Sequence, residues 1–143
     1  MSHFVMQHKV LFQHCDPAGI VFYPRYFEMI NAVVEAWFEE ALNESFATII
    51  AAGDGVPTRH IDTAFLRPSR LGETLTFTLD ACKLGRTSLD LRIAAECRSE
   101  ARLSAELTLV RIAQADGRPK PWPDMIAATI ESLIAKELIH GTR

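Results

Sequence analysis

The chain has 143 residues, of which 48% are apolar, and its formal net charge is −3 at pH 7. A chain of this length is expected to form one domain, and such a domain buries roughly 68–70% of its unfolded surface. The slightly negative charge argues against nucleic acid as the main partner, because proteins that track phosphates normally carry net positive charge. We therefore expect residues 1–143 to be a single domain with a core of its own.

The cysteines and the N-terminus predict the compartment. Cys15, Cys82 and Cys97 form no CxxC pair, and free cysteines in strand-like segments usually act as small core residues. The first nine residues lack the basic head and apolar stretch of a signal peptide. No apolar run reaches the ~18 residues that suggest a membrane span. These features predict a cytoplasmic protein without a membrane partner.

The first third of the chain is predicted to hold a strand, a loop and a long helix. Alternating apolar residues predict a strand from Phe4 to Phe12, and Pro17 and Gly19 then mark an irregular loop. From Pro24 the period changes to 3.6, which predicts a long amphipathic helix through Leu42. Residues 46–52 are compatible with a further short helix.

The rest of the chain predicts four strands and a second helix. The strands are Thr58–Leu66, Thr74–Lys83, Ser88–Arg98 and Leu103–Ile112. Leu84-Gly85-Arg86 is typical of a hairpin turn, and residues 99–102 are expected to form the next turn. The proline-rich stretch 116–123 precedes a C-terminal amphipathic helix. This order favours an α+β fold, with one antiparallel sheet packed on one long helix.

Several kinds of catalytic site are absent from the sequence. It contains no GxSxG elbow, no glycine-rich phosphate loop, no HExxH motif and no cysteines at zinc spacing. The histidines are scattered, at positions 3, 8, 14, 60 and 140. Dinucleotide chemistry, a serine-hydrolase mechanism and a metal site have no support, and no cofactor is expected.

The remaining concentration of reactive side chains is His14-Cys15-Asp16, between the first predicted strand and the long helix. A helix N-terminus offers unpaired N–H groups and about half a unit of positive charge, which can hold the oxygen of a polarised carbonyl. A nearby carboxylate can act as nucleophile or as general base for water. Because Asp is also common in turns and helix caps, these residues alone leave a catalytic and a structural role open for Asp16.

Residues 14–29 carry a longer motif, His-Cys-Asp-Pro-Ala-Gly-Ile-Val-Phe-Tyr-Pro-Arg-Tyr-Phe-Glu-Met. It resembles the signature of the 4-hydroxybenzoyl-CoA thioesterase family, Asp-x-Asp-Pro-Ala-Gly-x-Val-(aromatic)-(Tyr/Phe)-Pro-x-Tyr. The resemblance implies a hotdog fold, in which an antiparallel sheet wraps around one long helix. It also implies that Asp16 is the catalytic carboxylate and that the backbone N–H of Tyr23 polarises the thioester carbonyl.

One position departs from the family pattern. The family often has an acidic residue two positions before the catalytic Asp, where this chain has His14. With a pKa of ~6.5, a histidine there is suited to position Asp16 electrostatically or to move a proton. A structural hydrogen bond is the alternative role for His14.

The resemblance also indicates where the coenzyme binds. Similar thioesterases bind the nucleotide with a basic residue followed by hydroxyl residues, which maps onto Arg86, Thr87 and Ser88. Arg59, at a strand end, is a further cation suited to the phosphates. This chain has a single Arg in the turn, where the aryl-CoA enzyme carries a basic cluster, and a solvated turn is the alternative for Arg86.

The predicted reaction is hydrolysis of an acyl-CoA to the free acid and CoA, with an aromatic acyl group such as 4-hydroxybenzoyl or a short-chain one. A hydratase or dehydratase of the same fold is an alternative that needs a histidine paired with a carboxylate, for which only His14 and His60 are available. A non-catalytic acyl-CoA-binding module is another. Because hotdog domains pair edge to edge, we expect a homodimer or homotetramer joined through Thr58–Leu66.

Overall fold

The computed structural model describes the backbone of residues 3–141 and the side chains of residues 3–136. Its elements, in chain order, are β1 (Phe4–Lys9), the 3₁₀ helix η1 (Phe12–His14), α1 (Tyr23–Ala41), α2 (Phe46–Ala51), β2 (Asp54–Gly55), β3 (Thr58–Phe65), β4 (Thr74–Leu84), β5 (Ser88–Cys97), β6 (Glu100–Val110), β7 (Ile112–Ala113) and α3 (Asp124–Gly141).

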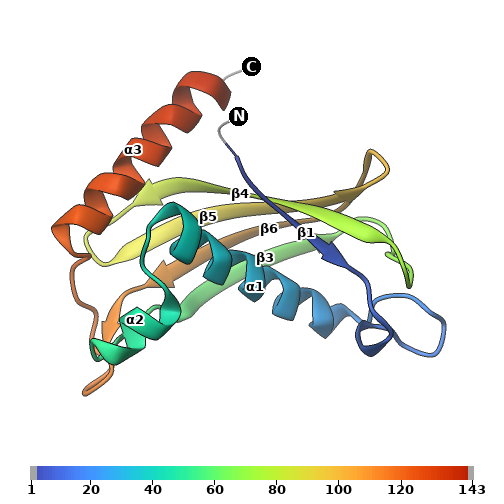
Figure 1. The fold of residues 1–143 in the computed structure, drawn as a ribbon, viewed down its shortest axis with the longest axis horizontal. Helices are drawn as coiled ribbons and strands as arrows, with labels where there is room; N and C mark the ends of the chain where they lie inside the picture. The colour runs from blue at the N-terminus through green and yellow to red at the C-terminus, as the bar shows by residue number, and fades with distance from the viewer. Residues whose placement is uncertain (1–2, 142–143) are drawn as a thin grey trace.

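Five of the strands form one antiparallel sheet in the order β1-β4-β5-β6-β3. The long helix α1 crosses one face of this sheet, and α3 packs against β4 (Figure 1). β1 and β3 are the two edge strands, so the prediction of Thr58–Leu66 as an uncovered edge agrees with the topology. Among the described residues, no helix is long and apolar enough to cross a membrane.

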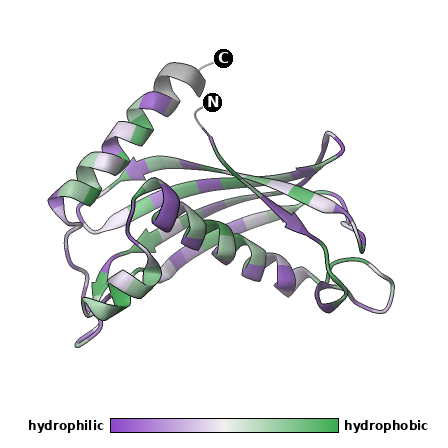
Figure 2. Cartoon of the chain, viewed as in Figure 1, coloured by the Kyte–Doolittle hydropathy of each residue, from purple (hydrophilic) through white to green (hydrophobic). Residues whose placement is uncertain are grey.

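The core lies between α1 and the sheet. Alternate residues of β5 and β6 are buried, and the apolar face of α1 covers them. Figure 2 shows this alternation as bands of contrasting hydropathy along the strands. Each fully buried Leu, Ile or Phe contributes about 1.5–3 kcal/mol of transfer free energy. The completely buried large residues include Phe38, Phe77, Ile93 and Leu109. The predicted 3.6 and 2.0 periods therefore describe the two layers correctly.

The first predicted strand is too long. β1 ends at Lys9, where its partner β4 begins with Thr74. Phe12 lies in η1 and is 83% exposed, rather than on the inward face of a strand. The physical reason is local, because the ring of His14 accepts a hydrogen bond from the N–H of Leu11 and the chain turns there. Periodicity alone could not show where the partner strand stops.

The predicted turn at residues 99–102 is also misplaced. β6 begins at Glu100, and the connection to β5 is made by Arg98 and Ser99, which have φ of 53° and 62°. Two consecutive positive φ values are typical of a two-residue hairpin turn, usually signalled by Asn or Gly. Neither Asn nor Gly is present at these positions, so no residue type signals so short a turn. As a result, Arg102 lies in β6 and not in the turn.

Candidate active site

Asp16 begins a tight hairpin between η1 and α1. Its N–H donates to Ile20 O at 2.9 Å, and its own carbonyl accepts from the N–H of Gly19 at 2.9 Å. Gly19 has φ of 77°, a conformation that strongly favours glycine over residues with a Cβ. The loop Pro17-Ala18-Gly19 therefore has the geometry of a three-residue hairpin. The Pro-Ala-Gly of the motif is thus explained by the turn that it forms.

The same hairpin connects Asp16 to the start of α1. Cys15 pairs with Val21, and the N–H of Phe22 donates to His14 O at 2.9 Å. Phe22 is the N-cap residue of α1 and makes no side-chain cap hydrogen bond, and among the described residues no acceptor is found for the N–H of Tyr23, the first helical residue. Asp16 and an N–H at the positive end of the helix dipole are thus held on one short ladder.

The Asp16 side chain is oriented by its own turn. Its Oδ1 accepts a hydrogen bond from the N–H of Ala18 at 2.9 Å, and the residue is partly buried. This bond is an Asx-turn, the structural role that the sequence left open. It occupies one oxygen, and no other hydrogen bond to the carboxylate is found within residues 3–136. The bond fixes the orientation of the carboxylate within the turn and leaves its other oxygen without a hydrogen bond among these residues.

His14 is turned toward the core. Its ring is 6% exposed, and Nδ1 accepts from the N–H of Leu11 at 2.8 Å. The ring lies edge-to-face with His8 at 6.5 Å between centroids. Burial, and secondarily the neighbouring His14, lower the pKa of His8 below its ordinary value. His14 therefore makes a structural hydrogen bond, while its predicted effect on Asp16 stays a prediction.

An exposed aromatic cluster surrounds the start of α1. Tyr23 is 58% exposed and lies 6.0 Å from Phe65, between ring centroids. Phe22 and Phe65 are about half exposed, and Phe27 also contacts Phe65 at 6.0 Å. Exposed apolar side chains gathered in one place indicate a binding surface rather than an ordinary solvated face. This surface lies where β3 leaves the sheet edge uncovered.

An apolar pocket continues from this cluster between α1 and β3. Its volume is about 250 Å³, and it begins one helical turn after Tyr23. The sequence analysis missed it because its walls come from three elements. The lining residues are Phe27, Ile30, Asn31, Val34, Thr58, Ile61 and Leu107.

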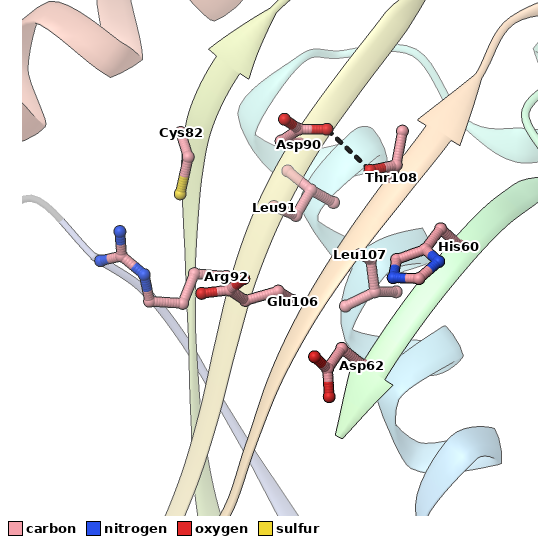
Figure 3. A pocket seen from close by; sticks show the side chains of 9 residues that line it. All are labelled: His60, Asp62, Cys82, Asp90, Leu91, Arg92, Glu106, Leu107 and Thr108. Atoms are coloured by element: carbon pink, nitrogen blue, oxygen red, sulfur yellow. Dashed lines mark hydrogen bonds between the residues drawn. The ribbon is translucent and has the colours of Figure 1, made fainter. Parts of the chain in front are cut away.

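A second, polar pocket lies on the opposite face of the sheet. Figure 3 shows its side chains projecting from β3, β4, β5 and β6, with Asp90 accepting a hydrogen bond from Thr108 at 2.8 Å. Burial raises the pKa of the Cys82 thiol, which disfavours a thiolate nucleophile. His60 lines this pocket, so it lies on the other face of the sheet from His14. The described side chains include no cluster suited to a metal.

The predicted coenzyme residues lie at the far end of the sheet. The Arg86 turn follows β4, whose 11 residues span roughly 33 Å from the end near Asp16. Backbone carbonyls of Arg86 and Ser88 accept from the main-chain N–H and the indole N–H of Trp122 at 3.2 and 3.1 Å. Arg59 lies in β3 at this same end. A single subunit therefore brings none of these residues beside Asp16.

Comparisons with known proteins place this architecture in a family. The model of the thioesterase superfamily matches residues 18–104, more than half of the chain. The chain is 25% identical over 133 residues to a 1,4-dihydroxy-2-naphthoyl-CoA hydrolase from Synechocystis sp. (strain ATCC 27184 / PCC 6803 / Kazusa), covering 88% of this chain and 96% of that relative.

Two solved structures show the same fold. One is a 1,4-dihydroxy-2-naphthoyl-CoA thioesterase from Synechocystis, with a TM-score of 0.83, 21% identity, and coverage of 92% of this chain and 97% of that chain. The other is a hypothetical protein from Staphylococcus aureus in complex with CoA, with a TM-score of 0.86, 17% identity, and coverage of 93% and 84%. The predicted α+β hotdog fold and the predicted thioesterase class are confirmed. The chain belongs to the thioesterase superfamily, the family that the motif at residues 14–29 indicated.

Proposed function

We propose that this thioesterase hydrolyses an aromatic acyl-CoA, with Asp16 as nucleophile or general base and the Tyr23 N–H as the donor to the thioester carbonyl. The observation that carries the proposal is the hairpin ladder that joins the backbone of Asp16 to the start of α1, which has no side-chain cap. The similarity to a 1,4-dihydroxy-2-naphthoyl-CoA hydrolase and to a protein that binds CoA supports the substrate class.

The two groups have complementary chemical tasks. The Tyr23 N–H donates to the carbonyl oxygen and stabilises the negative charge that develops there. Asp16 either attacks the carbonyl carbon, forming an anhydride that water then hydrolyses, or accepts a proton from the attacking water. In both routes the C–S bond breaks, CoA leaves as the thiolate, and the acid is released. Neither route needs a metal or a redox cofactor.

The pocket between α1 and β3 is the proposed site of the acyl group. It adjoins the aromatic cluster beside Tyr23, and its walls are mainly apolar. Asn31 and Thr58 are the polar residues of its lining. A mostly apolar pocket with a few polar groups is suited to an aromatic ring that carries hydroxyl groups. Asn31→Ala is therefore expected to weaken discrimination between hydroxylated and unsubstituted aromatic substrates.

A complete site is proposed to need two subunits. If two β3 edges pair in antiparallel fashion about a two-fold axis, the Thr58 end of one strand lies beside the Phe65 end of the other. A partner's Arg59 would then approach Tyr23 and Asp16. Such pairing would bring the proposed coenzyme-binding residues of one subunit to Asp16 of the other, although they lie far apart within one chain. We propose a homodimer, or a homotetramer of two dimers, of single-domain subunits in the cytoplasm.

Release of free CoA tests the activity directly. The purified protein is given aromatic, short-chain and branched acyl-CoAs with a thiol-reactive dye, and the fastest thiol release is expected from an aromatic acyl-CoA. Binding of acyl-CoA without thiol release would instead indicate a binding module. Hydration of an enoyl-CoA would indicate the alternative enzyme, which needs a histidine paired with a carboxylate. A single turnover in oxygen-18 water, with the label located in protein or product, distinguishes the nucleophilic from the general-base route.

A further inference from the structure

The segment 68–73 holds the Asp16 hairpin from the side away from α1. The N–H of Val21 donates to Ser69 O at 2.9 Å, and the N–H of Leu71 donates to Gly19 O at 3.0 Å. Ile20 also pairs with Arg70. The turn and the second arm of the hairpin are therefore bonded to this segment, and Asp16 is joined to that arm through its N–H to Ile20 O. A shift of the segment would thus move the hairpin that carries Asp16.

The segment is in turn held by Arg102, which reaches it from β6. The guanidinium NH1 donates to Glu73 Oε1 at 2.7 Å and to Pro68 O at 3.1 Å, and NH2 donates to Glu73 Oε2 at 3.2 Å. A weaker contact of 3.4 Å reaches Ser69 Oγ. Nε lies 3.0 Å from Glu100 Oε1 without forming a hydrogen bond. Arg102 thus contacts the first, second and last residues of the segment.

This ion pair is closely packed. Arg102 is 5% exposed and the side chain of Glu73 is 11% exposed. Hydrogen bonds from Arg102 and, secondarily, from the N–H of Arg70 hold the pKa of the Glu73 carboxyl at about 2. Replacing a buried ion pair by apolar residues is often neutral or stabilising. Stability alone is therefore a weak explanation for charges in this place, whereas a fixed fork of hydrogen bonds gives the segment one defined position.

We propose that Arg102, oriented by Glu73, is a positioning residue that fixes the Asp16 carboxylate relative to the Tyr23 N–H. The proposal rests on the catalytic role proposed for Asp16. In this role Arg102, which is 5% exposed, acts through the segment 68–73 and not by contact with the reacting atoms. Catalysis is sensitive to such positioning, since a displacement of about 1 Å can cost roughly 10²-fold in rate.

The chain offers a matched control at the other end of the sheet. Arg111 is 2% exposed and makes a two-pronged ion pair with Glu44, at 2.9 and 3.2 Å, and the Glu44 side chain is 12% exposed. This pair is similar in geometry and burial to that of Arg102 and Glu73, and none of its hydrogen bonds reaches the hairpin. Glu44→Gln therefore removes one buried carboxylate from a buried arginine without disturbing the segment 68–73, although Arg111 keeps its second ion pair with Asp54.

The experiment compares Glu73→Gln with Glu44→Gln, well below the melting temperature of either. For Glu73→Gln we expect kcat to fall by about tenfold or more with KM changed less than about twofold, because binding groups stay in place. Amide hydrogen exchange at Val21 and Leu71 should accelerate by about tenfold. For Glu44→Gln, in which Arg111 keeps Asp54, we expect some loss of melting temperature, a kcat within about twofold of wild type, and no change at these two amides.

Arg102→Lys gives an independent measurement should Glu73→Gln fail to fold. It keeps the charge but loses the fork, so its kcat should lie between wild type and Arg102→Met. Equal losses of kcat in Glu73→Gln and Glu44→Gln, or unchanged exchange at Val21 and Leu71, would overturn the positioning role. A wild-type protein that hydrolyses no acyl-CoA would overturn the proposed function instead, while the exchange comparison would still decide whether Arg102 holds the hairpin.

Discussion

The two ends of the sheet use the same stabilising device in different surroundings. At the Asp16 end, the ion pair of Arg102 and Glu73 lies behind a hairpin whose front presents a half-exposed aromatic cluster. At the far end, Arg111 is enclosed by Glu44 and Asp54, with the ring of Trp122 at 5.8 Å from its guanidinium carbon. There the buried charges are surrounded by other elements, and the Arg86 side chain is exposed to solvent.

This difference fits the proposal that the Asp16 end carries the reaction and the Arg86 end binds the coenzyme. The Asp16 end combines a buried ion pair with an exposed apolar surface and, among the described residues, a helix N–H without an acceptor, which is the combination that the proposed acyl-transfer site requires. The Arg86 end has a hydrogen-bonded backbone and an exposed cation, which suits the proposed contact with a charged part of the ligand that does not react. Because β4 separates the two ends, an acyl-CoA that touches both is expected to lie between subunits.

The largest effect is expected at Asp16. Asp16→Asn retains the shape and the Asx-turn acceptor but removes the charge and the nucleophilic oxygen. We expect kcat to fall by at least ~10²–10⁴, the usual contribution of a positioned base, with a melting temperature within a few degrees of wild type, since Asn and Asp serve such turns equally. A folded Asp16→Asn protein with normal kcat would make the residue purely structural, and Glu35, exposed on α1, would be tested next.

A smaller effect is expected on stability in acid. Because the folded pKa of Glu73 is about 2, below the ordinary 4.5, its ion pair stabilises the protein fully above pH 4.5 and progressively less as the pH falls toward 2. The linkage corresponds to a loss of about 2 kcal/mol between pH 7 and pH 3. The free energy of unfolding is measured with urea at both pH values for wild type and for Glu73→Gln. The difference between the two proteins should shrink by this amount from pH 7 to pH 3, because the contributions of the other carboxylates are the same in both. If the difference in unfolding free energy were the same at both pH values, Arg102 would not lower the pKa of Glu73.

The proposed sharing of sites between subunits can be tested with hybrids. We expect a dimer or tetramer in sedimentation, and low activity at sub-saturating substrate for both Asp16→Asn and the double variant Arg59→Ala, Arg86→Ala. When the two variants are refolded together, half of the dimers contain one subunit of each. In such a hybrid one site is intact, because it takes Asp16 from one subunit and the arginines from the other, and the second site is inactive. The mixture should therefore recover about one quarter of wild-type activity. A stable, active monomer, or no recovery in the mixture, would contradict the shared site.

The smallest effect is expected at the Arg86 turn. If Arg86 contacts CoA phosphates equally in the ground and transition states, Arg86→Ala should raise KM for acyl-CoA several-fold and leave kcat nearly unchanged. A short thioester without the nucleotide serves as the control, because both proteins should hydrolyse it at the same rate. An unchanged KM for acyl-CoA would show that Arg86 does not bind the coenzyme. It would also contradict the proposed role of this end of the sheet.

The sequence by itself determined the elements and the family. The 3.6-residue period from Pro24 and the alternation in β4 and β5 depend on neighbours in the chain, so they predicted α1 and the central strands within a few residues. The motif at residues 14–29 is likewise a local feature, since the hairpin needs Gly19 at positive φ and the helix starts just before Pro24. These features could be predicted because each depends on residues that are close to one another in the sequence.

Only the tertiary structure decided which residues meet. Arg102 was expected in a turn, and its contact with Glu73, 29 residues away, depends on the register of β6. The pocket beside Tyr23 needs α1, β3 and β6 together, and the direction of the His14 ring depends on the local fold at Leu11. Likewise, the distance from Arg86 to Asp16 follows from the length and direction of β4. Such contacts follow from sheet order and strand register, which are set by the packing of distant segments and leave no periodic pattern in the chain.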